Sequence, residues 1–436
     1  MTESAARGST GLRPDAVVEV AIEKSVYRGR GLGRVDGRVV FIPRAHAGDR
    51  VRARVTEVHA GWAEAVLLGV LDAAPERRES PCRYVPLCGG CAYQDLGYAA
   101  QLRAKEAVLR ESLARAGVPW EGPVEVHPSP EAGWRLRASL HFAPGGRLGL
   151  RQEGTRRVVD VDTCLQLSER MNRTARALRD RLAESPSLAR RLRGLDLLES
   201  PDGRTLVATL AAVLPPHEAS SLAPIGSGVP DLDGFGVQAG SGLHWLHGTP
   251  FIEATVLGLS LRAHARSFVQ ANRFLLEPLV RTVVGLVPVG EGPVTDLYCG
   301  VGLFSLPLAA RGEPEVIAVE RSPSAAEDAR WNARHNRLDR VRVVEAAVEN
   351  ALRSVGPAGR ERLVLDPPRT GAGLEVTGLV ADRAPEAVVY VSCDPATLAR
   401  DLAAFAARGY RPDAVHVFDL FPDTFHLETV VRLRRS

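Results

Sequence analysis

The fold is constrained most strongly by a series of apolar runs in the last third of the chain. Each run stops at an acid or a cysteine. The runs beginning at Val294, Val316, Arg362 and Ala387 are rich in β-branched residues, and helix-like segments separate them. This alternation predicts a doubly wound α/β sheet with buried parallel strands. In such sheets ligands bind outside the carboxyl ends of the strands. We therefore expect one ligand site at a single rim, formed by Asp296, Glu320, Asp366 and Cys393.

Cys393 follows the strand-like run AVVYVS, and Pro395 stands where a helix would begin. A lone cysteine is often only a small buried hydrophobic residue. Its place on a rim with three acids favours a chemical role instead.

The turn after the first of these strands contains Gly300 and Gly302, which allow the backbone to approach a ligand closely. Glu320, 24 positions after Asp296, ends the second strand and can accept hydrogen bonds from both ribose hydroxyls of an adenosine-containing ligand. A complete G-x-G-x-x-G motif is missing, and a candidate nucleophile is present. These features favour S-adenosylmethionine over a dinucleotide.

Bulk properties describe an ordinary globular chain. Its 436 residues predict roughly three domains, which we place at 14–72, 73–265 and 266–436. The net charge of +3 is too small to indicate nucleic-acid binding by itself. We recognise neither a signal peptide nor a membrane-spanning stretch, so we expect a cytoplasmic protein with no membrane partner.

Residues 14–72 contain short alternating runs separated by glycine-rich turns, which predicts a small β-barrel. The period of two in RVRARV places Arg50, Arg52 and Arg54 on one face. Five further arginines lie between Arg28 and Arg44 against the single acid Asp36. Such a basic surface suits an RNA backbone. The segment GRGLGRVDGRVVFIPRAHAGDRVRARV also resembles the TRAM domain, an RNA-binding barrel, and residues 134–157 look like a second arginine-rich, RNA-facing sheet in a mixed α+β central domain.

Three of the six cysteines, Cys82, Cys88 and Cys91, lie close together in the sequence. Cys164 is a fourth candidate ligand for a metal site. Four thiolates can hold zinc or an iron–sulfur cubane, and the presence of only one C-x2-C unit favours the cubane. The stretch CGGCAYQDLGYAAQLRAK resembles the motif of RNA uracil-5 methyltransferases that carry a 4Fe-4S cluster. That resemblance implies four cluster ligands, Cys82, Cys88, Cys91 and Cys164.

The catalytic segment resembles the same family. The stretches SFVQANRFLLEPL, DLYCGVGLFSLPLA, LVLDPPRTG, YVSCDPATLARDL and FPDTFHLETVVRL follow the successive motifs of RNA 5-methyluridine methyltransferases. The resemblance implies a Rossmann-like class I methyltransferase domain, Cys393 as nucleophile and Glu428 as general base. It also implies contacts to S-adenosylmethionine from Gln270, Tyr298, Glu320 and Asp366, beside Gly300 and Gly302. Asp423 and Phe425 depart from the family pattern, which puts the local shape of the base-binding pocket in question.

Methylation of uracil at C5 requires both a nucleophile and a base. C5 of uracil is a poor nucleophile, so a cysteine must first add to C6 and make C5 electron-rich. A carboxylate then removes the C5 proton so that the cysteine can leave. The target base must also leave its stack.

The resemblance to cluster-bearing members indicates 23S rRNA as the first candidate substrate and tRNA as the second, with a monomer as the expected state. An RNA 5-methylcytosine methyltransferase is disfavoured because no cysteine follows Asp366-Pro367-Pro368. A radical methylthiotransferase would need a C-x3-C-x2-C motif, which is missing. A non-catalytic iron–sulfur RNA-binding protein would not need Cys393, Asp366 and Glu428.

Overall fold

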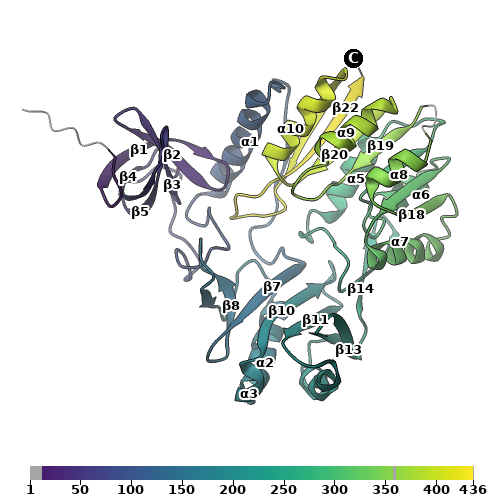
Figure 1. Cartoon of the computed structure of the whole chain (residues 1–436), viewed down its shortest axis with the longest axis horizontal. Coiled ribbons are helices and arrows are strands. Elements are labelled where there is room, and N and C mark those ends of the chain that lie inside the picture. The colour runs from purple at the N-terminus through teal and green to yellow at the C-terminus, as the bar shows by residue number, and fades with distance from the viewer. Residues whose placement is uncertain (1–11, 357–359, 436) are drawn as a thin grey trace, which may run out of the picture. The chain divides into compact units, whose positions relative to one another are not determined.

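The computed structural model describes residues 12–356 and 360–435 (Figure 1). The chain divides into two compact units. Unit 1 contains the residues up to Val85 together with Cys91–Val108 and Asp423–Phe425. Unit 2 contains Pro86–Gly90, Leu109–Pro422 and the residues from His426 onward.

Unit 1 is built on a closed five-stranded barrel, drawn in purple in Figure 1, with strand order β1-β2-β3-β5-β4. The strands are β1 Val17–Val26, β2 Arg30–Val35, β3 Arg38–Pro43, β4 Arg50–Val58 and β5 Trp62–Asp72. The predicted barrel is confirmed, but β2 lies where the sequence indicated only a glycine-rich turn. Its glycines are needed because a Cβ on Gly31 would meet Ala45 O at 2.5 Å and one on Gly33 would meet Ala21 O at 2.4 Å.

The alternation predicted for β4 is confirmed. Val51, Ala53 and Val55 are buried, whereas Arg50, Arg52 and Arg54 are exposed. Acidic side chains lie beside these arginines. Arg50 forms ion pairs with Glu19 at 2.7 Å and with Asp72 at 3.2 Å. Arg44, which was expected to extend the basic surface, is instead buried at 7% exposure. It follows β3 with a φ of 61°, in a turn that directs its side chain away from solvent.

Unit 2 contains two large sheets and a hairpin. The first sheet has seven strands in the order β13-β12-β11-β10-β7-β8-β9. These are β7 Arg137–Ala143, β8 Arg147–Arg151, β9 Val158–Asp160, β10 Leu192–Glu199, β11 Leu206–Ala212, β12 Gly234–Ala239 and β13 Gly242–Gly248. The helices among them are α2 Glu169–Ala183, α3 Pro186–Ala189, the 3-10 helix η1 Pro216–Leu222 and α4 Ala223–Ser227. The hairpin pairs β14 Phe251–Val256 with β15 Leu259–His264.

The second sheet has eight strands in the order β18-β17-β16-β19-β20-β22-β21-β6. Its strands are β6 Glu125–His127, β16 Val294–Leu297, β17 Val316–Glu320, β18 Val341–Glu345, β19 Arg362–Leu365, β20 Ala387–Ser392, β21 Tyr410–Phe418 and β22 Glu428–Arg435. The first five strands in the sheet order run parallel, and β22 is antiparallel to both neighbours. This is the predicted Rossmann-like sheet. β6, from the segment predicted to be central, pairs with β21 at the edge.

Helices cover both faces of this sheet. Its helices are α1 Tyr98–Arg115, α5 Leu276–Leu286, α6 Ser305–Ala310, α7 Pro323–His335, α8 Val348–Ser354, α9 Gly373–Asp382 and α10 Pro395–Ala406. Buried side chains of α5 and α6 form the core on one face, and those of α8, α9, α10 and the end of α1 form the core on the other. Within the described residues, no helix has the length and apolar character needed to cross a membrane.

Candidate active site

The carboxyl ends of the parallel strands bring the predicted rim residues to one edge of the eight-stranded sheet. Asp296 lies near the end of β16 and pairs in register with Val364 of β19, and Asp366 follows β19 directly. Glu320 ends β17, and Cys393 follows β20. The strand order reverses between β16 and β19, which is where open α/β sheets bind ligands. The predicted shared rim is confirmed.

The turn after β16 has an unusual backbone. Gly300 and Gly302 have φ values of 57° and 91°, and a Cβ on Gly302 would lie 2.2 Å from Leu306 Cδ1. Tyr298 also has a positive φ of 63°, which is a genuine outlier for a bulky residue. Such strain persists only where the surroundings enforce it, and it concentrates at functional sites. The turn is therefore shaped for a ligand that approaches the backbone closely.

Glu320 is fixed by two backbone amides. The Gly300 N–H donates to Oε2 at 3.0 Å, and the Ser322 N–H donates to Oε1 at 2.6 Å. A carboxylate has about four lone-pair positions, so both oxygens can still accept hydrogen bonds. This arrangement fixes the orientation of the side chain and leaves it able to accept from a ligand.

A cleft opens beside the turn. It encloses about 650 Å³ of empty space, which includes open solvent at its mouth. Tyr298, Gln270 and Asp366 line it together with largely apolar side chains. Gln270 Nε2 donates to Asp366 Oδ2 at 3.1 Å, so the two residues orient each other. The cleft thus combines an apolar wall with a few polar groups, as small-ligand sites do.

Two aspartates at this edge, the buried Asp296 and the partly buried Asp366, have raised pKa values. Burial raises the pKa of Asp296 to about 7, although the Ser305 hydroxyl donates to its Oδ2 and opposes the shift. Burial and the charge of Asp296 raise the pKa of Asp366 to about 7, and the hydrogen bond from Gln270 opposes that shift. Both carboxyls would be stabilised in their ionised form by a cationic ligand.

Cys393 and Glu428 lie next to each other across two antiparallel strands. Ser392 ends β20 and pairs in register with Thr429 of β22, so Cys393 directly follows and Glu428 directly precedes the last pair of this ladder. Burial, followed by the charges of Glu428 and Asp366, raises the pKa of the Cys393 thiol to about 12. Burial and the charge of Asp366 raise the pKa of Glu428 well above its ordinary value. The arrangement places a thiol near a buried carboxyl whose charge affects its pKa.

Helix α10 begins directly after the thiol. The Asp394 side chain caps it by accepting hydrogen bonds from the Ala396 and Thr397 N–H groups at 2.9 and 3.0 Å. The cap fixes the turn that carries Cys393. Sequence reasoning placed the helix start at Pro395 correctly.

Three further residues belong to the site but were given no role from the sequence. Ser305 holds Asp296, and Phe268 lines the cleft although its side chain is 64% exposed. The exposed Arg369 lowers the pKa of both Cys393 and Glu428. Ser305 and Arg369 lie within the motif stretches quoted above, and Phe268 lies two positions before Gln270, so proximity to the motifs was the available signal.

The residues that depart from the family pattern have a structural explanation within unit 1. The carboxylate of Asp423 accepts hydrogen bonds from Gln94 Nε2 at 2.8 Å and from Gln101 Nε2 at 3.0 Å. Its backbone oxygen accepts from the Ala92 and Tyr93 N–H groups. The ring of Phe425 packs edge-on against Tyr27, with 5.8 Å between ring centroids. Both side chains therefore fix the loop to its neighbours in unit 1.

The four predicted cluster cysteines divide between the units. Cys82 and Cys91 belong to unit 1, and Cys88 and Cys164 belong to unit 2. Two of the sulfurs accept hydrogen bonds, Cys88 Sγ from the Gly90 N–H at 3.4 Å and Cys91 Sγ from Gln94 Nε2 at 3.8 Å. Donors to sulfur are a feature of cysteines that ligate iron–sulfur clusters. The donor set fits such a cluster chemically.

Comparison with known proteins supports the same reading. The model of the tRNA (Uracil-5-)-methyltransferase family matches residues 258–436, and that of the TRAM domain matches residues 15–68. The 23S rRNA (uracil(1939)-C(5))-methyltransferase RlmD of Pseudomonas putida is 35% identical, covering 94% of this chain and 92% of the relative. The protein of the same name from Alkalilimnicola ehrlichii is 34% identical, covering 97% of this chain and 98% of the relative.

A solved structure is similar over nearly the whole chain. It is the tRNA (uracil-54, C5)-methyltransferase of Pyrococcus abyssi in complex with S-adenosyl-L-homocysteine. The TM-score is 0.76 at 27% identity, covering 95% of this chain and 99% of that one. Full-length relatives, the TRAM match and the Rossmann-like rim agree. The chain belongs to the family of S-adenosylmethionine-dependent RNA (uracil-5-)-methyltransferases.

Proposed function

We propose that this enzyme methylates C5 of a uridine in 23S rRNA through a covalent bond between Cys393 and C6. The observation that carries the mechanism is the register of β20 and β22, which sets Cys393 beside the buried Glu428 at the ligand-binding rim. The full-length relatives from Pseudomonas putida and Alkalilimnicola ehrlichii are named for 23S rRNA. The similar solved structure is named for tRNA, which makes tRNA the second candidate.

Catalysis begins with the thiol. The Cys393 thiolate forms a bond to C6, and the electron pair of the C5–C6 double bond moves into an enolate. C5 then takes the methyl group, and the bond between that methyl and the cosubstrate sulfur breaks. S-adenosylmethionine, when bound, supplies this methyl group and a positive charge. The covalent step divides one difficult substitution into easier ones.

Glu428 resolves the adduct. Its carboxylate removes the proton from C5, the C5–C6 double bond re-forms, and the sulfur–C6 bond breaks. Without this base the RNA would remain attached to Cys393. The same burial that raises the pKa of Glu428 makes it a stronger base than an exposed glutamate.

Before the substrates bind, burial favours the protonated form of both groups. It raises the pKa of the Cys393 thiol to about 12 and raises the pKa of Glu428 well above its ordinary value. A bound cation lowers the pKa of nearby acids and thiols. Cys393 and Glu428 would therefore become ionised after the cosubstrate and RNA bind, which limits side reactions of the nucleophile.

The cleft residues fit binding of the cosubstrate. We assign Glu320 to the ribose hydroxyls, Tyr298 and the glycine turn to the adenosine, and the pair Gln270 and Asp366 to the cationic end. Asp366 lines the cleft and contributes to the electrostatics of Cys393 and Glu428. It thus connects the cosubstrate cleft with the catalytic pair.

We also propose that Cys82, Cys88, Cys91 and Cys164 hold a 4Fe-4S cluster. Bound iron and sulfide would cross-link the segment 82–91 to Cys164, which lies far along the sequence. The test is iron and sulfide analysis with visible absorption of anaerobically purified enzyme. Each of the four Cys→Ser variants should lose the cluster, and Cys299→Ser should keep it, because Cys299 is a buried residue of the methyltransferase sheet. Full iron content in all four variants would contradict the assignment.

RNA binding is assigned to the barrel face of Arg50, Arg52 and Arg54. Nearby acids such as Glu19 make this face less basic than its arginine content indicates. Binding should therefore depend on salt less steeply than three free cations would require.

The function is tested with RNA that contains 5-fluorouridine, in which C5 carries no removable proton. Wild-type enzyme with S-adenosylmethionine should form a stable adduct with 23S rRNA, and Cys393→Ala should form none. Adduct formation by Cys393→Ala would overturn the mechanism. An adduct with tRNA alone would replace the proposed substrate with the second candidate. Mass spectrometry of rRNA and tRNA from a strain without the gene then locates the 5-methyluridine.

A further inference from the structure

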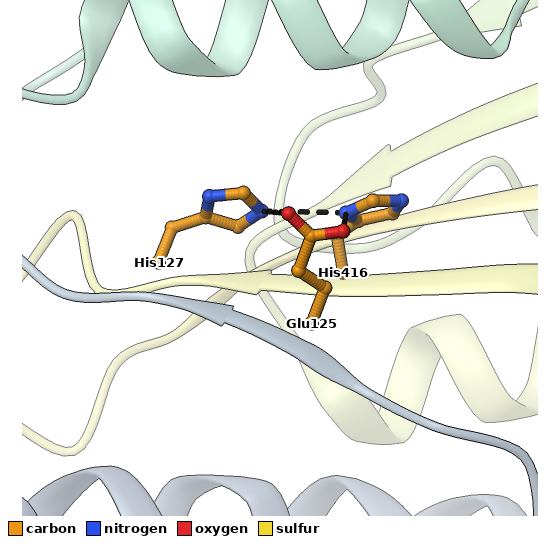
Figure 2. A group of neighbouring side chains, drawn as sticks. All are labelled: Glu125, His127 and His416. Atoms are coloured by element: carbon orange, nitrogen blue, oxygen red, sulfur yellow. Dashed lines mark hydrogen bonds and ion pairs between the residues drawn. The ribbon is translucent and has the colours of Figure 1, made fainter.

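Two histidines and a glutamate meet at the edge of the eight-stranded sheet, away from the rim residues in the sequence. Glu125 and His127 lie two positions apart on β6, so both point to one face of that strand. His416 lies on β21, where it pairs in register with Glu125. Figure 2 shows the two imidazole rings and the carboxylate turned toward a common point.

The ligand atoms are spaced as in a metal site. His127 Nε2 lies 3.3 Å from His416 Nδ1, and the two carboxylate oxygens of Glu125 lie 3.5 Å from His127 Nε2 and 3.4 Å from His416 Nδ1. A tetrahedral zinc ion with ligands at about 2.0–2.1 Å has ligand atoms about 3.3–3.4 Å apart. The distance between the two nitrogens is therefore close to one edge of such a tetrahedron, and one oxygen of the Glu125 carboxylate faces each nitrogen at a similar distance.

The surroundings hold the imidazoles in place. The ring of His127 stacks on Phe418 with 4.0 Å between centroids, and the side chains of His127 and His416 are only 19% and 13% exposed. The Glu125 side chain is 65% exposed, which leaves the fourth tetrahedral position open to water. The neighbouring cation Arg432 is held by Asp413, with 2.7 Å between Nε and Oδ1.

The protonation of the histidines agrees with this geometry. Burial lowers the pKa of His127 and of His416, although Glu125 opposes both shifts. Neutral imidazole is the form that binds metals. A pair of histidines that share one proton could account for the contact between their nitrogens, but it would not require the third donor at the same spacing.

We propose that Glu125, His127 and His416 bind a zinc ion, with water as the fourth ligand. The site is distinct from the cysteine set and from the cosubstrate cleft. Its role is structural, because β6 is a three-residue edge strand that is paired with the sheet only through β21. The ion would fasten β6, and with it the segment between α1 and β7, to the sheet.

The residues before β6 are already anchored on their other side. Arg110 of α1 donates to the backbone oxygens of Trp120 and Gly122 at 2.8 and 3.2 Å. The zinc ion would fix the next few residues in the same way. Metal binding should therefore stabilise unit 2 without changing the chemistry of the methyl transfer.

The test is zinc titration by calorimetry of the full-length enzyme with its cysteine site occupied. Wild type should bind one zinc ion, and His127→Gln and His416→Gln should each bind about 100-fold more weakly or worse, since even outer-shell changes cost 10–100-fold. His59→Gln is the matched control, because His59 Nε2 also lies near one glutamate, 3.4 Å from Glu57 Oε2, and it should titrate as wild type.

Two further measurements keep the result decisive. Cobalt(II) bound at this site should show the spectrum of nitrogen and oxygen ligands without sulfur-to-metal absorption, which separates it from the cysteines. Glu125→Gln alters only the exposed ligand, so it provides a folded variant if either histidine variant unfolds. Zinc binding that is unchanged in Glu125→Gln and in the histidine variants, or a wild type that binds no zinc, overturns the proposal.

Discussion

The amino and carboxyl ends of the same parallel strands differ in whether their charged side chains form ion pairs. At the amino ends, Arg383 forms a two-pronged ion pair with Glu361, with both nitrogen–oxygen distances 2.8 Å. Arg362, fully buried, lies 2.8 Å from Glu313. At the carboxyl ends, Asp296 is buried and Asp366 is partly buried, and the pKa of each is raised to about 7.

The difference separates a structural end from a functional one. Buried charges normally persist only when they are paired and hydrogen-bonded. The amino ends obey this rule. The carboxyl ends keep acids together without a matched guanidinium, and strongly shifted pKa values of this kind cluster at functional sites. We propose that the cationic cosubstrate balances these acids when it binds.

The strongest test of the functional end is Glu428→Gln. The amide cannot take the C5 proton, so turnover should fall by about 10²–10⁴-fold. The enzyme should also accumulate a covalent complex with ordinary, unfluorinated RNA, visible as a shifted band in a denaturing gel. Glu345→Gln is the control, since Glu345 ends β18 on the same rim but is ion-paired with Arg330. Normal turnover by Glu428→Gln would remove Glu428 from the mechanism.

The structural end is tested by Arg383→Met. Removing the guanidinium leaves Glu361 buried with only Thr295 as a side-chain hydrogen-bond donor, at 2.6 Å. Breaking a buried pair on one side typically costs about 3–5 kcal/mol. Denaturant unfolding followed by circular dichroism should show a loss of this size. The double variant Arg383→Met with Glu361→Gln should recover part of it, and a single-variant loss below about 1 kcal/mol would contradict the pairing argument.

This division also explains what sequence could predict. β19 was placed at Arg362–Leu365 from its apolar run, and β17 was placed within one residue. The rim followed because parallel strands share their carboxyl edge. The amino-end pairs could not be foreseen, since Arg383 and Glu361 come from separate elements and an arginine-rich composition hides particular partners.

Short or glycine-rich strands were missed for a different reason. β6 has only three residues, and β2 contains two glycines, so neither carries a clear period of two. The cluster of Glu125, His127 and His416 joins residues 289 positions apart, and only the pairing of β6 with β21 brings them together. Local pattern contains no information about such a pairing.

The raised pKa of Asp296 at the carboxyl ends predicts that the stability of the folded enzyme decreases as the pH rises. Asp296 has a folded pKa of about 7 against an ordinary value of 3.8, so the folded state keeps this proton while the unfolded state has lost it. The associated stability is complete below about pH 4 and is lost as the pH rises through 7. Asp296→Asn should therefore gain stability relative to wild type from pH 5 to pH 8, on the order of a few kcal/mol at most.

The matched control is Asp328→Asn. Asp328 is also buried, but it accepts from the His264 N–H and the Ser267 hydroxyl and pairs with Arg262. Its replacement should destabilise the ligand-free enzyme. Melting temperatures of wild type and both variants across this pH range provide the measurement. A difference between wild type and Asp296→Asn that does not grow with pH would show that Asp296 is balanced in the free enzyme.

The smallest expected effect concerns Arg369, an arginine whose positive charge acts on Cys393 and Glu428 at the carboxyl ends of the strands. It lowers the pKa of Cys393 and of Glu428, but it is exposed, so solvent and salt screen its charge. Arg369→Gln should raise the pKa of the thiol and slow its alkylation by iodoacetamide at a fixed pH by less than about tenfold, the equivalent of one pKa unit. Peptide mass spectrometry of Cys393 gives the rate, and added salt should reduce the difference. Arg400→Gln is the control, because Arg400 on α10 is paired with Asp401. Alkylation that is equally fast in Arg369→Gln and wild type at low salt would mean that Arg369 does not lower the pKa of the thiol. The carboxyl ends would then differ even more from the amino ends, where each buried acid described above is paired with an arginine.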